Sequence, residues 1–193
     1  MGLDQYIYRI EKLTEDDKKR IDQGETTGFS TVELNSPEDK ELVEYIKDFV
    51  YIKDKVIEYY SHDKIRKYFN IPDTATFIFS RSDSTSVVWL FKDKIADKEY
   101  RVEPSKVKNI SEVTDTKTVK EVFLKEQEIG YWRKNYKLQD KMHYACDHPV
   151  RNCGYYPLNK EMIRILLKDR TNIFARDDLT STDNVVICYL EWY

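Results

Sequence analysis

Two β-rich runs in the middle of the chain constrain the fold more than any other feature of the sequence. The first is TATFIFS at residues 74–80, and the second is STSVVWLF at residues 84–91. β-Branched and aromatic residues favour strands, so the runs predict a β-hairpin that turns around RSD at 81–83. KEYRVEP (98–104) and KTVKEVFLK (117–125) predict two more strands. The centre of the chain is therefore expected to form an antiparallel sheet.

Further strands are predicted near both ends of the chain. Leu3–Ile10 alternates, which places Tyr6 and Tyr8 on one face. Residues 28–34 predict a short strand, and NVVICYLEWY (184–193) predicts a strand rich in apolar residues. That last strand could be a sheet edge that pairs with a second copy, so a homodimer is an open alternative.

Cap residues followed by apolar spacings of three and four predict helices between these strands. Thr14, Ser36, Ser61 and Asn159 stand at N-cap positions. The helix after Ser36 is expected to run for about six turns along one apolar stripe. The stripe consists of Leu42, Tyr45, Ile46, Phe49, Ile52, Val56 and Tyr60. A further helix is predicted over 126–145, from the spacing of its aromatic and apolar residues.

These elements predict one α+β domain over residues 1–193. Its mostly antiparallel central sheet would carry several packed helices. The sequence changes from a helical to a β-rich pattern near residues 70–74, so a sub-boundary of the domain at this point is the alternative.

Composition narrows the classes of function. The formal charge is -3 and aromatic residues make up 13% of the chain. The densest basic patch, RKNYK at 133–137, is small, so direct nucleic-acid binding is not favoured. No apolar stretch approaches the length of a membrane span. Three cysteines without a secretory signal predict a reducing, cytoplasmic location.

Four of the six His and Cys residues fall within MHYACDHPVRNC at 142–153. His143, Cys146, His148 and Cys153 could together close a tetrahedral zinc site. The single residue between Cys146 and His148 is shorter than the usual spacing in such sites, so we expect no cofactor and keep zinc as an alternative. The other interpretations are a helix end that leads into a loop, and a nucleophilic Cys153 activated by a nearby imidazole.

A second candidate site is the aromatic and basic run around Trp132. Trp132 and Arg133, with Tyr131, Lys134 and Tyr136 beside them, could stack on bases or anchor a protein partner. The alternative is that Trp132 packs in the core while Arg133 forms an internal ion pair.

Three stretches of the chain also match a family pattern. They are MGLDQYIYR (1–9), EIGYWRKNYKLQ (128–139) and NCGYYPLNKEMIRILL (152–167), and the closing EWY is similar too. In these segments the chain resembles a family of uncharacterised phage and prophage proteins. The resemblance includes Cys153 and the run Tyr131–Lys134, but not the other His and Cys residues of the 142–153 window. It implies a phage origin and no mechanism.

Three functions follow from these observations. The first is a non-enzymatic phage or prophage accessory protein that binds and inhibits a host factor, such as a CRISPR effector or another defence nuclease. Its partner would be a host protein or protein–nucleic-acid complex, approached through acidic segments such as TEDDKK and ARDDLTSTD. The second is an enzyme that acts on a nucleotide or nucleic acid through Arg133 and Cys153 or His143. The third is a zinc-stabilised interaction domain.

Overall fold

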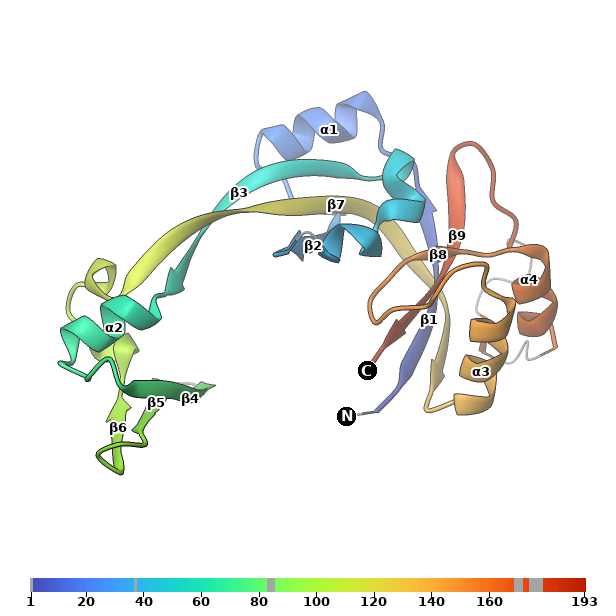
Figure 1. Cartoon of the computed structure of the whole chain (residues 1–193). Coiled ribbons are helices and arrows are strands. Elements are labelled where there is room, and N and C mark those ends of the chain that lie inside the picture. The colour runs from blue at the N-terminus through green and yellow to red at the C-terminus, as the bar shows by residue number, and fades with distance from the viewer. Residues whose placement is uncertain (1, 37, 83–85, 169–171, 174–178) are drawn as a thin grey trace. The chain divides into compact units, whose positions relative to one another are not determined.

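Two antiparallel sheets organise the chain in the computed structural model, which describes residues 2–36, 38–82, 86–168, 172–173 and 179–193 (Figure 1). The strands are β1 (Asp4–Glu11), β2 (Ser30–Leu34), β3 (Tyr51–Tyr60), β4 (Ala75–Ser82), β5 (Val87–Asp93), β6 (Lys98–Val102), β7 (Thr114–Arg133), β8 (Tyr156–Pro157) and β9 (Val185–Trp192). The α-helices are α1 (Glu15–Asp22), α2 (His62–Tyr68), α3 (Tyr136–Ala145) and α4 (Lys160–Leu166). Short 3₁₀ helices are η1 (Glu38–Leu42), η2 (Glu44–Phe49), η3 (Pro104–Lys106) and η4 (Ile110–Glu112). The predicted α+β class is confirmed.

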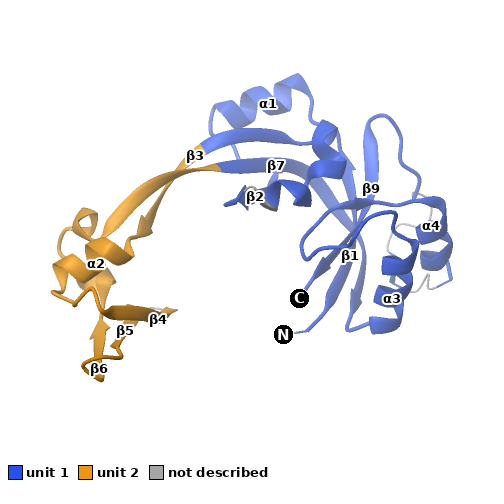
Figure 2. Cartoon of the chain, in the orientation of Figure 1, with its two compact units in different colours: residues 1–54, 120–193 blue, residues 55–119 orange. Residues whose placement is uncertain are grey.

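The chain divides into two compact units (Figure 2). Residues 1–54 and 120–193 form the first, and residues 55–119 form the second. The predicted sub-boundary at 70–74 lies inside the second unit, just before β4. The single domain over residues 1–193 stays a prediction. Within the described parts of the chain, no helix is both long enough and apolar enough to cross a membrane.

The larger sheet gives the first unit two distinct faces. Its strand order is β2-β7-β1-β9-β8, with β3 also paired to β7. β1 lies between β7 and β9 and is antiparallel to both. Because side chains alternate along a strand, Gln5 and Ile7 point to one face, while Asp4, Tyr6 and Tyr8 point to the other. We call these the helix face and the tyrosine face.

A hydrophobic core covers the helix face. Ile7, Trp132 and Tyr189 from the sheet pack with Met142 of α3 and Leu166 of α4, and all five are buried. Figure 1 shows α3 and α4 together on one side of β1. Burial of this many large side chains makes the helix face the main stabilising layer of the first unit.

The tyrosine face is covered at one end by a second core. There Ile10, Leu124 and Val186 of the sheet pack against Val43 and Ile46, which belong to the η1–η2 region. The other end of this face carries half-buried side chains of β1 and β7.

The second unit has its own core. Its sheet has the order β4-β5-β6, and α2 supplies Ile65 to a cluster with Ala75, Trp89 and Phe91. The predicted β-hairpin is confirmed, and it consists of β4 and β5. Asp83 of the predicted turn lies outside the described residues.

The predicted six-turn helix after Ser36, with its apolar stripe from Leu42 to Tyr60, is wrong. The cap at Ser36 forms, since Asp39 N–H donates to Ser36 Oγ at 3.3 Å, but only 3₁₀ helices follow and residues 51–60 form β3. The four-residue steps from Ile52 to Val56 to Tyr60 are even numbers, so they fit a strand's period of two as well as a helix. β-Branched and aromatic residues then favour the strand.

The predicted helix over residues 126–145 begins ten residues late, at Tyr136. Residues before it belong to β7, which ends at Arg133. A β-bulge explains the false helical period, because Gly130 pairs with Ile7 and Glu128 with Tyr8, which leaves Ile129 as the extra residue. Ile129 and Trp132 therefore reach the same core although they are three residues apart.

The strand β9 is not the free edge that was predicted for a homodimer. Cys153 N–H donates to the carbonyl of Glu191 at 2.7 Å, and Leu158 N–H donates to that of Ile187 at 2.8 Å. Between them, Tyr156 pairs with Tyr189. That edge is occupied by residues 152–158, and homodimerisation itself stays a prediction.

The remaining local predictions are confirmed, namely β1, β2, β6, β9, the strand over residues 117–125 as part of β7, and the helices after Thr14, Ser61 and Asn159. Asn159 Oδ1 accepts from the backbone N–H groups of Glu161 and Met162 at 3.0 and 2.9 Å. On α4, Met162 and Leu166 are buried, whereas Leu167 just beyond the helix is exposed.

Thr14→Ala is expected to lower the free energy of unfolding by about 1 kcal/mol. Thr14 Oγ1 accepts from Asp17 N–H at 3.1 Å, and Asp17 Oδ2 accepts from Thr14 N–H at 2.9 Å, which forms a capping box at the start of α1. Urea denaturation followed by circular dichroism measures the change. Thr27→Ala, at an exposed loop position, is the control and should shift stability by less than about 0.5 kcal/mol. Equal losses in the two variants would contradict the cap.

Candidate functional site

A row of tyrosine rings crosses the tyrosine face. Tyr6 and Tyr131 lie directly opposite in the β1–β7 register, with ring centroids 5.1 Å apart. Tyr6 and Tyr8 stack at 5.7 Å, and Tyr8 contacts Tyr155 at 6.2 Å. We call Tyr131, Tyr6, Tyr8 and Tyr155 the tyrosine row. Tyr155 is buried, and the side chains of the other three are half-buried.

Carboxylates accompany the tyrosine row. Tyr131 donates its hydroxyl to Asp4 Oδ1 at 2.8 Å, and Tyr155 donates to Glu126 Oε2 at 2.9 Å. Burial, with Glu126 and Glu128 nearby, raises the pKa of Tyr8 to about 12. The hydrogen bond to Asp4 raises the pKa of Tyr131. The phenols are therefore neutral hydrogen-bond donors near pH 7, and the negative charge of this face comes from the carboxylates.

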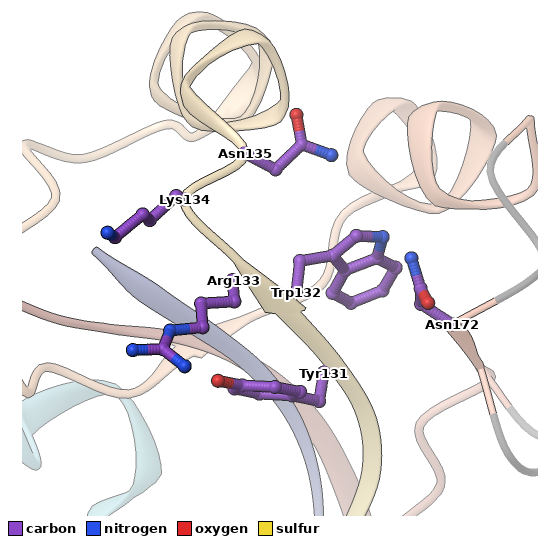
Figure 3. Close-up of a pocket in the computed structure, with 6 residues that line it drawn as sticks. All are labelled: Tyr131, Trp132, Arg133, Lys134, Asn135 and Asn172. Atoms are coloured by element: carbon purple, nitrogen blue, oxygen red, sulfur yellow. The ribbon is translucent and has the colours of Figure 1, made fainter. Parts of the chain in front are cut away.

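A pocket of about 470 Å³ lies where β7 ends (Figure 3). Its lining residues are Tyr131, Trp132, Arg133, Lys134, Asn135 and Asn172. Figure 3 shows the Arg133 and Tyr131 side chains extending together, while the Trp132 indole points the other way, beside Asn172. Lys134 adopts a left-handed conformation with φ 55°, and Asn135 Oδ1 accepts from Leu138 N–H at 3.1 Å to begin α3. This turn ends β7 and leaves the Arg133 guanidinium largely exposed, with Nε 4.0 Å from Asp4 Oδ1.

The structure separates the residues that the sequence grouped around Trp132. Tyr131 and Arg133 share the tyrosine face, but Trp132 is only 2% exposed and belongs to the core of the helix face. Tyr136 is exposed in the first turn of α3. The core interpretation therefore holds for Trp132, whereas Arg133 is largely exposed and not held in an internal ion pair. It is Tyr6, across the sheet, that joins Tyr131 in one aromatic surface.

Hydrogen bonds and close packing hold the segment around Cys153 in place. Tyr155 N–H donates to the Leu42 carbonyl at 2.9 Å, and the Tyr156 hydroxyl donates to the Pro149 carbonyl at 3.0 Å. A Cβ at Gly154 would lie 2.8 Å from the Tyr156 ring, so only glycine fits there. Burial raises the pKa of the Cys153 thiol, which lowers its thiolate fraction and its nucleophilicity.

A polar cluster on the helix face includes one of the predicted candidates, His143. The side chain of Glu191 is fully buried and accepts three hydrogen bonds. Tyr189 donates its hydroxyl at 2.6 Å, Gln139 donates its amide at 3.0 Å, and His143 Nε2 lies 3.0 Å away. A carboxylate only accepts, so Nε2 carries the proton and Nδ1 is the nitrogen that can accept one. The arrangement orients a partly exposed imidazole with a buried carboxylate.

The four predicted metal ligands face different partners. His143 bonds Glu191, whereas His148 stacks on Tyr45 with centroids 4.2 Å apart. Cys146 and His148 line a pocket of about 310 Å³, and burial raises the pKa of the Cys146 thiol. In the parts of the chain that the structure describes, no group of three or more His, Cys, Asp or Glu side chains is arranged to hold a metal ion. Zinc binding stays an untested alternative.

Reasoning from sequence missed Glu191 and the partners of Tyr131. One signal for Glu191 was available, since it is a lone carboxylate within an apolar run that predicts a buried strand. No local signal could have joined Tyr131 to Asp4, which lies 127 residues away in the sequence.

No protein-family model, curated protein sequence or solved structure matches the chain. The resemblance to phage and prophage proteins therefore stays a prediction.

Proposed function

We propose that the chain is a non-enzymatic phage or prophage accessory protein that binds and inhibits a host factor, such as a CRISPR effector or another defence nuclease. The observation that carries the proposal is the tyrosine row with its carboxylates. Partly exposed tyrosines present a large contact area at low conformational cost, and they are enriched at the centres of protein interfaces.

The negative charge of the tyrosine face favours a partner with a basic surface. Asp4 and Glu128 help to raise the pKa of Tyr6, and Glu126 and Glu128 help to raise that of Tyr8, so carboxylates lie near both rings. Lysine and arginine side chains of a partner can pair with such carboxylates and also lie over aromatic rings. A nuclease presents basic groups of this kind in the channel that holds its nucleic acid, so an acidic, tyrosine-bearing surface is complementary to it.

The position of Trp192 extends this surface. Trp192 pairs with Asp4 in the β1–β9 register, and it is 57% exposed. Its alternation places it on the tyrosine face next to Asp4, and Arg133 lies on the opposite side of Asp4. A large exposed aromatic residue beside a charged rim is the usual composition of an interaction hot spot.

The Tyr6→Ser/Tyr131→Ser variant is expected to lose at least about tenfold of its inhibitory effect, because it removes two adjacent rings from the proposed interface. Inhibition is measured as the survival of a targeted plasmid in bacteria with an active CRISPR nuclease, and the nuclease is then assayed for capture by the purified chain. Tyr144→Ser is the matched control, since Tyr144 is 93% exposed on α3, and it should inhibit like the unmodified chain. Circular dichroism verifies that both variants are folded.

Two results would contradict the proposal. One is a chain that neither protects the plasmid nor retains a nuclease at low salt. The other is full activity of the Tyr6→Ser/Tyr131→Ser variant, which would remove the tyrosine row from the interface.

An enzyme that acts on nucleotides is the second candidate, and the His143–Glu191 contact favours it. A buried carboxylate that orients an imidazole is a common arrangement for a general base. Arg133, however, extends from the tyrosine face, whereas His143 bonds a residue of the helix face. Nucleotide hydrolysis that His143→Ala abolishes would support this candidate against the binding function.

A further inference from the structure

The sheet of the second unit has one face that its own helix does not cover. Trp89 and Phe91 of β5 point towards α2 and belong to the core. The alternate residues Val88 and Leu90 point the other way. In the register, Leu90 lies between Phe79 of β4 and Arg101 of β6, and Val88 lies opposite Arg81. We call this the Phe79 face.

The Phe79 face is hollowed and has an apolar floor. A pocket of about 320 Å³ is lined by Phe79, Arg81, Val88, Leu90, Glu99 and Arg101. Phe79 is 49% exposed, while Val88 and Leu90 are half-buried. A β-bulge between Phe77 and Phe79 produces this arrangement, because it sends Phe77 into the core and Phe79 to the opposite face.

Two arginines stand on either side of the apolar floor. Arg81 and Arg101 are exposed, and neither forms an ion pair within 4.0 Å with any described residue. Glu99 is the single carboxylate among the residues that line the pocket. Residues 55–119 also contain more basic than acidic side chains, in contrast to the rest of the chain. The charge of this face therefore complements carboxylates.

The strand β4 leaves one edge of this sheet open. β4 pairs with β5 alone within its sheet, and its residues from Ile78 to Ser82 are exposed. Ile78 is 47% exposed, and no charged residue lies between Ala75 and Ser80. Natural edge strands normally carry charged or proline residues that prevent pairing with another chain. Along β4 the only charged residue is Arg81, near its end, so the stretch from Ala75 to Ser80 can accept an added strand through its backbone groups.

We infer that β4 and the Phe79 face bind an extended acidic segment of a partner protein. The segment adds a strand along β4, sets apolar side chains against Phe79, and pairs its carboxylates with Arg81 of the same strand. Arg101, on β6 further into the sheet, adds positive charge to this face. The segment's main-chain hydrogen bonds supply affinity, and the two arginines supply the preference for acidic sequences. This inference uses residues of the second unit alone and does not depend on the function proposed for the tyrosine face.

The test is binding of a fluorescein-labelled peptide to the full chain, followed by anisotropy. The peptide fluoresceinyl-Glu-Thr-Val-Thr-Val-Thr-Glu-amide, labelled at its N-terminus, places two valines and two glutamates on one face when extended. We expect saturable binding, and about tenfold weaker binding of the same peptide with Lys in place of Glu. Arg81→Glu/Arg101→Glu should weaken binding about tenfold. Phe79→Thr, which keeps a strand-forming residue, should weaken it about fivefold.

Lys108→Glu is the matched control, because it reverses an exposed positive charge in the same unit outside the pocket. It should change affinity by less than about twofold. Equal affinity for the Glu and Lys peptides would overturn the inference. So would tighter binding of a twelve-residue oligothymidylate that Arg81→Glu/Arg101→Glu abolishes, which would assign the face to nucleic acid. A dimer that Phe79→Thr dissociates would assign the edge to a second copy instead.

Discussion

Trp132→Ala is expected to lower the free energy of unfolding by about 4 kcal/mol. The indole is 2% exposed and packs in the core between the sheet and the two C-terminal helices, with Ile7, Met142 and Leu166 in the same cluster. Removing so large a buried side chain loses its transfer free energy and leaves a cavity that the rigid β1–β7 pair cannot close. Chemical denaturation followed by far-ultraviolet circular dichroism measures the loss.

The adjacent residue is the matched control for this prediction. Tyr131→Ala removes a half-buried ring from the tyrosine face together with its hydrogen bond to Asp4, and it should cost only about 1–2 kcal/mol. The two variants should also separate in function, because Tyr131 belongs to the proposed interface and Trp132 does not. Equal stability losses at positions 131 and 132 would contradict the assignment of these neighbours to opposite faces.

Local signals predicted those parts of the fold that local chemistry decides. Thr14 and Asn159 satisfy free N–H groups at helix starts within three residues, so their caps could be recognised from sequence. The β4–β5 hairpin also connects neighbouring segments, and its β-branched and aromatic residues suit a half-buried sheet. The antiparallel pairing of β6 with β5 is likewise explained by the short connection between these two strands.

Two long segments were misassigned because the spacing of their apolar residues fits more than one structure. Along Ile52, Val56 and Tyr60 the step of four suits both periods, and pairing with β7 decides for the strand. At Ile129 the bulge inserts one residue, so that an odd spacing still reaches one core. A bulge depends on the partner strand, and the partner of β7 at this point is β1, more than a hundred residues away in the sequence.

The candidate site was predicted in part for the same reason. Tyr131 and Arg133 were identified as candidate binding residues from their composition, but their neighbours Tyr6 and Asp4 reach them only through the register of β1 with β7. The window at 142–153 grouped four potential ligands by sequence, yet His143 bonds Glu191 of β9 whereas His148 stacks on Tyr45 of η2. Proximity in sequence implies proximity in space for backbone atoms, whereas metal sites require convergent side chains.

Glu191→Ala is expected to lower the free energy of unfolding by about 3–4 kcal/mol. The carboxylate is fully buried, and three donors from Tyr189, Gln139 and His143 depend on it. Alanine leaves these donors without their acceptor and also opens a cavity between β9 and α3. Because Gln139 and His143 are one turn apart on α3, the loss should loosen that helix first, which hydrogen exchange of the α3 amides would detect.

Two further variants distinguish the contribution of the Glu191 carboxylate to stability from that of His143. Glu191→Gln keeps the volume and one acceptor oxygen, so it should cost about 1–2 kcal/mol. His143→Ala removes a partly exposed donor and should cost about 1 kcal/mol, because water can replace it at the rim of the cluster. If His143→Ala destabilised the chain as much as Glu191→Ala, the pair would be a purely structural link between α3 and β9. If Glu191→Ala cost less than about 1 kcal/mol, the buried carboxylate would not stabilise this face, and a general base oriented by Glu191 would become the better explanation for its position.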